Sequence, residues 1–104
     1  MPSSDYSDDE FEWNLQKGKE NLAKHGVSFE LARCVFNDPA HYTGQGYVEN
    51  AELRYDTLGR VSELLVLRVT HIEKTYGKIS KIRILSARKA DGKERNVYER
   101  KAFQ

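Results

Sequence analysis

The chain has 104 residues, a formal net charge of +1 and 38% hydrophobic residues, enough apolar material for one small core. No stretch approaches the roughly 20 apolar residues of a membrane span, and the acidic N-terminus lacks the basic and apolar regions of a signal peptide. We therefore expect a cytoplasmic protein. The single cysteine, Cys34, excludes an internal disulfide, and no His/Cys cluster has zinc-site spacing, so neither a metal nor a cofactor is expected.

The charges are unevenly distributed along the chain. Five acidic residues and no lysine or arginine lie within residues 1–12, which leaves 11 acidic against 17 basic residues in the remainder. We expect residues 1–10 to form a flexible acidic tail and residues 11–104 to form one basic domain. A basic domain suits an anionic ligand, although a soluble, charged surface explains the same surplus.

Two helices are predicted in the first third of the domain. Alternation of apolar and polar residues over 11–13 indicates a short edge strand. Residues 15–25 read as a helix that ends at Gly26, with Leu15 and Leu22, seven apart, on its inner stripe. Ser28 is a good N-cap for a second helix, which Asn37-Asp38-Pro39 terminates.

A β-meander and a third helix are predicted for the rest. Strands are expected over 47–55, 64–67 and 79–85, with a turn at 58–60 and a hairpin over 71–78. Asp91 and Glu94 have capping-box spacing ahead of a last helix that contains Tyr98. The pattern indicates an α+β fold with two N-terminal helices, an antiparallel meander and a C-terminal helix.

Most polar positions on one predicted face of these strands are cationic. If the register permits, one sheet face carries Glu52, Arg54, Arg68, Lys81 and Arg83, four of which are cationic. Lysine and arginine dominate phosphate binding, and arginine can hold two phosphate oxygens at once. The pattern favours a phosphate-binding face, and an ordinary solvated antiparallel face is the alternative.

Two segments carry a family resemblance. The first runs from Phe11-Glu12-Trp13-Asn14 to Asn21-Leu22-Ala23-Lys24-His25-Gly26-Val27-Ser28-Phe29-Glu30. The second is Ile82-Arg83-Ile84-Leu85-Ser86-Ala87-Arg88-Lys89-Ala90, followed by Glu94-Arg95 and Tyr98-Glu99. In order and separation they resemble the opening and the close of the BrnT toxin family, so the resemblance covers residues 11–103.

The resemblance implies a RelE-like fold and a ribonuclease activity that arrests translation. It also implies a BrnA-like antitoxin with a ribbon-helix-helix DNA-binding part, which would bring operator DNA to the complex and repress its operon. The dimerisation of such an antitoxin predicts a heterotetramer or a higher assembly. Positions that match the family pattern are Lys24, Arg54, Arg83 and Arg88.

Metal-free RNA cleavage needs a base for the 2′-hydroxyl proton, cations for the charged phosphorane, and an acid for the leaving oxygen. His25 suits the base or the acid because histidine titrates near neutral pH, although a packed or capping histidine is the alternative. Glu52 is a second candidate base and Lys24 a candidate acid. Arg54, Arg83 and Arg88 are expected to stabilise the phosphate, and Arg68, Lys81 and Lys89 to bind RNA.

Two other functions remain open from the sequence. A protein of the same fold could be catalytically inert and only bind RNA or its antitoxin, and a plain interaction module could dock an acidic protein on its basic face. Trp13, Tyr47 and Tyr55 could stack on bases, but packing is the commoner role of such residues. Ser86 has no recognisable Ser/His/Asp arrangement around it, which argues against triad chemistry.

Overall fold

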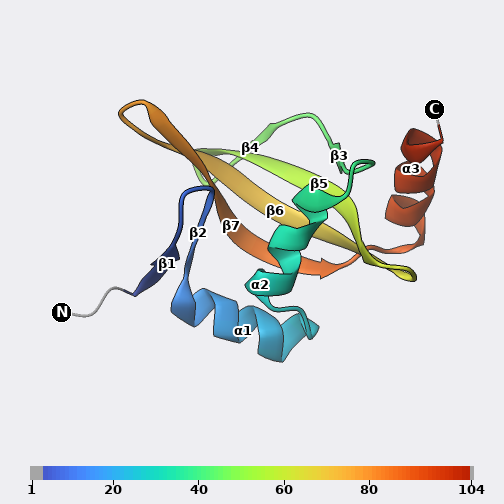
Figure 1. Cartoon of the computed structure of the whole chain (residues 1–104), viewed down its shortest axis with the longest axis horizontal. Helices are drawn as coiled ribbons and strands as arrows, with labels where there is room; N and C mark the ends of the chain where they lie inside the picture. Colours follow the sequence, from blue (N-terminus) through green and yellow to red (C-terminus); the bar gives the residue numbers. More distant parts are fainter. Residues whose placement is uncertain (1–3, 104) are drawn as a thin grey trace.

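The structure is a computed structural model that describes residues 4–103. Its strands are β1 (Asp5–Ser7), β2 (Phe11–Asn14), β3 (Tyr42–Thr43), β4 (Tyr47–Glu49), β5 (Glu52–Ser62), β6 (Leu65–Tyr76) and β7 (Ile79–Lys89). Its helices are α1 (Leu15–His25), α2 (Phe29–Ala32), the 3₁₀ helix η1 (Arg33–Asn37) and α3 (Gly92–Ala102). In Figure 1 β1 lies at one end of the molecule and α3 at the other, and α1 runs below the sheet between them. No helix within the described range is long and apolar enough to span a membrane.

One sheet organises the fold, with the strand order β1-β2-β7-β6-β5-β3, and β4 pairs with β5. The predicted meander is confirmed for β5, β6 and β7, which pair antiparallel. The predicted hairpin over 71–78 is wrong in its bounds, because β6 continues to Tyr76 and only Gly77 and Lys78 form the turn. The sheet as a whole is mixed, because β2 runs parallel to β7, with Glu12 opposite Arg83. Parallel pairing needs a long crossover, which the chain between β2 and β7 supplies, and sequence patterns within single strands do not reveal such pairing.

The two faces of the sheet carry different helices. Leu67 and Val69 of β6 belong to the main core with residues of α2 and η1, whereas Val66 packs with Leu58 and with Tyr98 of α3. Because side chains alternate along a strand, these clusters lie on opposite faces. Helix α3 covers only one end of its face, and the uncovered remainder is called the open face below (Figure 1).

Helix α1 has the predicted bounds but a different inner side. Leu15 is 43% and Leu22 51% exposed, so the predicted inner stripe is wrong. The buried residue of this helix is Asn21, whose side chain bonds to backbone atoms of Val27 and Ala87. Polar contacts with the edge of β7, rather than apolar burial, therefore orient α1.

The predicted strand over 47–55 is two strands. Asn50 (φ 52°) and Ala51 (φ 60°) form the two-residue connection of the β4–β5 hairpin, the geometry that suits a tight hairpin turn. The predicted turn at 58–60 is wrong, because β5 continues through it. Gly59 serves close packing there: an added Cβ would lie 2.6 Å from Val35 Cβ of η1.

The acidic N-terminal segment is ordered from Asp5 onward, which corrects the expectation of a flexible tail for these residues. Strand β1 pairs antiparallel with β2, and Tyr6 stacks on Trp13 with ring centroids 4.3 Å apart. Asp8 accepts hydrogen bonds from the backbone N–H groups of Glu10 and Phe11 and pairs with Arg33 at 2.8 Å. Bonds to this carboxylate, first that from the Tyr6 hydroxyl, lower the pKa of Asp8. Residues 1–3 lie outside the described range.

The other predicted helices form with good caps. Ser28 accepts a hydrogen bond from the backbone N–H of Leu31, and the second helix is one α turn that continues as the 3₁₀ helix η1. At α3 the predicted capping box is confirmed, since the Asp91 side chain accepts from the Glu94 N–H and the Glu94 side chain from the Asp91 N–H.

Candidate functional site

The predicted polar positions share one side of the sheet. Thr57, Val69, Ile84 and Ala87 are buried on the side of α1 and α2, and strand alternation turns their neighbours to the open face. This face therefore carries Glu52, Arg54, Arg68, Lys81, Arg83 and Arg88.

A groove runs where helix α1 meets the edge of β7. One pocket of about 290 Å³ is lined by Asn14, Lys17, Glu52, Arg54, Arg83, Ile84, Leu85 and Ser86. A neighbouring pocket of about 240 Å³ is lined by Lys17, Glu20, Asn21, Lys24, His25, Leu85 and Ser86. Lys17, Leu85 and Ser86 line both, so we treat the two pockets as one feature, the α1–β7 groove. It gathers five of the six predicted catalytic residues.

A β-bulge forms the floor of this groove. Thr70 of β6 pairs with Ser86 and the next residue, His71, pairs with Ile84, so Leu85 is an extra residue in β7. Bulges bend a strand and redirect its side chains. Ile84 and Ala87 consequently both reach the core despite their spacing of three, and Leu85 and Ser86 both line the groove.

Asn21 fixes the wall of the groove. Its Nδ2 donates to the carbonyl oxygens of Val27 at 2.9 Å and Ala87 at 2.8 Å, and its Oδ1 accepts from the Ala87 N–H at 3.1 Å. The amide thus satisfies both backbone groups of Ala87 at the free edge of β7. At the other end of α1, the Asn14 side chain caps the helix by accepting from the Lys17 N–H at 2.9 Å. These contacts hold Lys17 and Lys24 of α1 beside Ser86.

Arg83 is held by two carboxylates. Its Nη1 donates to Glu12 Oε2 at 2.5 Å and to Asp5 Oδ2 at 3.1 Å, and the Tyr76 hydroxyl donates to Glu12 Oε1 at 2.7 Å. Partial burial lowers the pKa of Arg83, but the bonds to Asp5 and Glu12 outweigh it and raise the pKa. The hydrogen bond to Glu12 also raises the pKa of Tyr76. Arg83 therefore enters the groove as a fixed cation.

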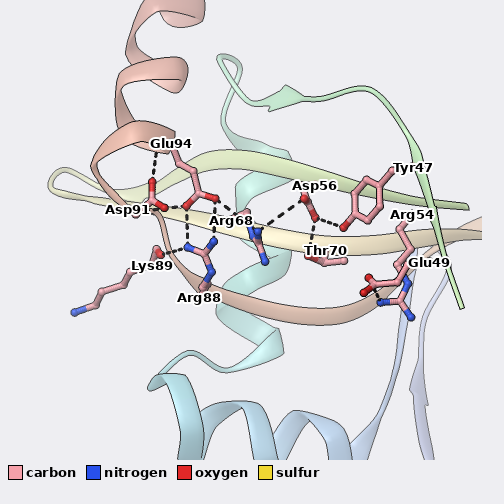
Figure 2. Close-up of polar contacts among 10 residues, drawn as sticks. All are labelled: Tyr47, Glu49, Arg54, Asp56, Arg68, Thr70, Arg88, Lys89, Asp91 and Glu94. Atoms are coloured by element: carbon pink, nitrogen blue, oxygen red, sulfur yellow. Dashed lines mark hydrogen bonds and ion pairs between the residues drawn. The ribbon is translucent and has the colours of Figure 1, made fainter.

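The other open-face arginines are also paired (Figure 2). Arg54 donates to Glu49 at 3.0 Å and to Glu52 at 3.1 Å. Towards α3, Arg88 grips both oxygens of Glu94 at 2.8 and 2.9 Å, and this contact raises the pKa of Arg88.

Arg68 lies between two carboxylates on the same face, 3.7 Å from Glu94 and 3.9 Å from Asp56. Asp56 also accepts from the hydroxyls of Tyr47 and Thr70. Figure 2 shows this chain of contacts running from Glu94 across β6 towards Tyr47. The face that was expected to be cationic is therefore a network of ion pairs in which arginines and carboxylates alternate.

The remaining predicted residues lie at the ends of this surface. Lys24 and His25 are exposed in the last turn of α1, so His25 is not the packed residue that the sequence allowed. Lys89 is exposed at the end of β7 near Arg88, whose Nη1 donates to its carbonyl. Lys81 lies at the β1 edge, where its Nζ donates to Ser7 Oγ at 2.8 Å. Arg88, Arg68, Lys89 and Lys81 thus lie outside the groove.

Of the three aromatic residues that could have stacked on bases, Trp13 is a core residue. Trp13 is 1% exposed, stacks on Tyr6 and meets Phe29 edge-on. Tyr55 is half-buried and stacks on His71, while Tyr47 is exposed and bonds to Asp56.

Sequence reasoning missed Glu12 and Lys17 as site residues. The sequence contained a clue to each. Glu12 is the polar residue between the apolar Phe11 and Trp13, and Lys17 lies seven residues before Lys24, on the same side of the helix.

The groove contains the parts that acid–base phosphoryl chemistry uses. Lysines and arginines can bind phosphate oxygens, and a histidine and a carboxylate can move protons. Within residues 4–103, no group of three or more His, Cys, Asp or Glu side chains is arranged to hold a metal ion.

Comparison with known proteins gives the family. The profile of the ribonuclease toxin BrnT of type II toxin-antitoxin systems matches residues 13–94, most of the chain. The chain belongs to the BrnT family. The crystal structure of the Brucella abortus ribonuclease toxin BrnT is similar, with a TM-score of 0.52 and 22% sequence identity over 76% of this chain and 92% of that chain. No curated protein sequence matches significantly.

Membership of the BrnT family links the chain to ribonuclease toxins. The family consists of ribonuclease toxins, and a type II toxin implies an antitoxin partner. At 22% identity the structural similarity to the Brucella protein supports the mixed α+β fold. Strand β1 and most of α3 lie outside the residues that match the BrnT profile.

Proposed function

We propose that this BrnT family member is a metal-independent endoribonuclease with a RelE-like fold, which cleaves RNA through attack of the ribose 2′-hydroxyl and thereby inhibits translation. The α1–β7 groove carries the proposal, because it brings Lys24, His25, Glu52, Arg54 and Arg83 to one place. A 2′-hydroxyl nucleophile makes RNA the substrate and leaves DNA uncut. The product is a 2′,3′-cyclic phosphate.

The roles follow from the chemistry of the side chains. His25 or Glu52 takes the proton from the 2′-hydroxyl, and Lys24 or His25 protonates the 5′-oxygen leaving group. Arg54 and Arg83 stabilise the charge that develops on the phosphate. The contact with Glu12 supports this role, since a guanidinium that is already oriented needs little reorganisation in the transition state.

The rest of the open face would bind the RNA strand beyond the groove. Arg68 and Arg88 lie towards α3 and Lys81 lies towards β1, while Lys89, opposite Leu67 at the end of β7, would reach the strand from the other side of the sheet. Arg88 would then contact a flanking phosphate or stabilise the reacting one after exchanging Glu94 for a phosphate oxygen. Such exchange is favoured by the bidentate geometry that arginine offers to both carboxylate and phosphate.

The antitoxin of this system is proposed to be a BrnA-like ribbon-helix-helix protein. It would cover the groove, form a heterotetramer or a higher assembly through its own dimerisation, and bring the complex to operator DNA in the cytoplasm. The implied antitoxin partner of the family supports this part of the proposal.

The test compares Arg83→Ala with Arg100→Ala, an exposed arginine on α3 that serves as the charge-matched control. Cleavage of single-stranded RNA in EDTA should fall by about 100-fold or more for Arg83→Ala, the usual effect of losing one transition-state donor, and should persist for Arg100→Ala. Induced expression should arrest growth for the parent and the control only. Equal cleavage by Arg83→Ala and the parent would refute the assignment, and loss of cleavage in EDTA would refute metal independence.

A catalytically inert RNA- or antitoxin-binding module is the second candidate. The observation that favours it is that Arg54, Arg68, Arg83 and Arg88 all pair with carboxylates of the same chain. Intact RNA after incubation with folded parent protein, together with normal growth on expression, would favour this function over the nuclease.

A further inference from the structure

Strand β1 presents two sets of side chains to opposite sides of the sheet. Tyr6 points to the core side, where it stacks on Trp13 with an interplanar angle of 21°. Its neighbours Asp5 and Ser7 therefore face the open side, as does Glu12, the residue that pairs with Ser7 across β2. The backbone pairing with β2, the Tyr6 stack and the Asp8 turn anchor the strand independently of the side-chain contacts that Asp5 and Ser7 make with β7.

The two open-side residues of β1 occupy two cations. Asp5 Oδ2 accepts a hydrogen bond from Arg83 Nη1 at 3.1 Å, and Ser7 Oγ accepts one from Lys81 Nζ at 2.8 Å. Arg83 lines the groove, and Lys81 is two residues away on the same face of β7. An anionic oxygen and a hydroxyl oxygen thus lie where two successive cations of β7 would otherwise take phosphate oxygens.

Glu12 and Asp5 differ in how readily they can leave Arg83. The Glu12 side chain is 5% exposed and also accepts the Tyr76 hydroxyl, so releasing Arg83 would leave the Glu12 carboxylate as a buried charge without its cation. The Asp5 side chain is 37% exposed on an edge strand, so water can solvate it when it turns away. Glu12 is the permanent partner of Arg83, and Asp5 is the exchangeable one.

We propose that β1 is an intramolecular competitor of RNA, in which Asp5 and Ser7 occupy Arg83 and Lys81 until phosphates of an RNA strand displace them. This inference rests on the proposed function, because it takes Arg83 and Lys81 as RNA-binding residues. The backbone of β1 stays paired with β2 during the exchange, and only the side chains of Asp5 and Ser7 turn outward. The matched part of the BrnT profile begins after β1, at residue 13.

The experiment measures RNA affinity in the full-length protein. The probe is a short, fluorescently labelled 2′-O-methyl oligonucleotide, which has the RNA backbone but lacks the 2′-hydroxyl needed for cleavage. Asp5→Asn is compared with Asp9→Asn, which removes the same charge from the same exposed segment but from a residue outside the Arg83 and Lys81 contacts. Trp13 fluorescence verifies that each variant is folded.

Asp5→Asn is expected to bind the probe about two- to fivefold more tightly than the parent, since an exposed ion pair has an effect of this size. Asp9→Asn should change affinity less, and Asp5→Asn should have no effect in an Arg83→Ala background. Equal affinities for Asp5→Asn and Asp9→Asn, with weaker binding by Arg83→Ala, would overturn the competitor and leave the proposed function standing. Parent-like binding by Arg83→Ala would overturn both.

Discussion

Asn21 offers the sharpest test of how the groove is built. Its amide makes three hydrogen bonds to backbone groups of Val27 and Ala87, and only 7% of the residue is exposed. At about 1 kcal/mol for each bond, Asn21→Ala should lose about 3 kcal/mol, offset by about 0.5 kcal/mol from the higher helix propensity of alanine. We expect the free energy of unfolding to fall by about 2.5 kcal/mol.

Urea denaturation followed by the fluorescence of Trp13, the single and buried tryptophan, measures this loss. The matched control is Asn96→Ala, an exposed asparagine of α3, which should change stability by less than about 0.5 kcal/mol. Asn21→Ala should also weaken RNA cleavage beyond its effect on folded protein, because Lys17 and Lys24 lose their fixed place beside β7. A loss in stability below about 1 kcal/mol would refute the view that this amide, rather than apolar burial, docks the helix.

Two further predictions concern the core. Burial lowers the pKa of His71 to about 4 from its ordinary value of 6.5, so the folded state holds it neutral. The resulting stability is present above about pH 6.5 and is lost as the pH falls towards about 4. In urea titrations across this window, the free energy of unfolding of the parent should fall by up to about 1.4 kcal/mol per pH unit more than that of His71→Gln. Equal pH dependence of the two proteins would contradict the lowered pKa of His71. Gly59→Ala would place a methyl group 2.6 Å from Val35 Cβ and 2.8 Å from its carbonyl oxygen, so it should cost about 1–3 kcal/mol. Gly92→Ala, where an added Cβ meets nothing within 4 Å, should be neutral in the same assay, and a neutral Gly59→Ala would show that η1 can move away.

The sequence alone determined the parts of the protein that depend on local chemistry. Gly26 in the left-handed region ends α1, and Ser28 and Asp91 cap the next helices through their own side chains. Alternation predicted much of β7 and also β2, although β2 is buried on both sides and lies between β1 and β7 instead of at the predicted sheet edge. The family signature lies in the same segments, and the profile match over residues 13–94 confirms it.

Tertiary structure decided what single segments do not encode. Alternation placed Arg54 and Arg83 on the correct side of their strands, but the bulge at Leu85 and the docking of α1 through Asn21 are what join them to Lys24 and His25 in one groove. The pairing of Arg83 with Glu12 was also hidden, because these two residues are 71 positions apart in the sequence. Gly59 of β5 was predicted to lie in a turn for the same reason. A glycine is needed there because Val35 of η1 packs against it, and contacts between distant segments leave no local pattern in the sequence.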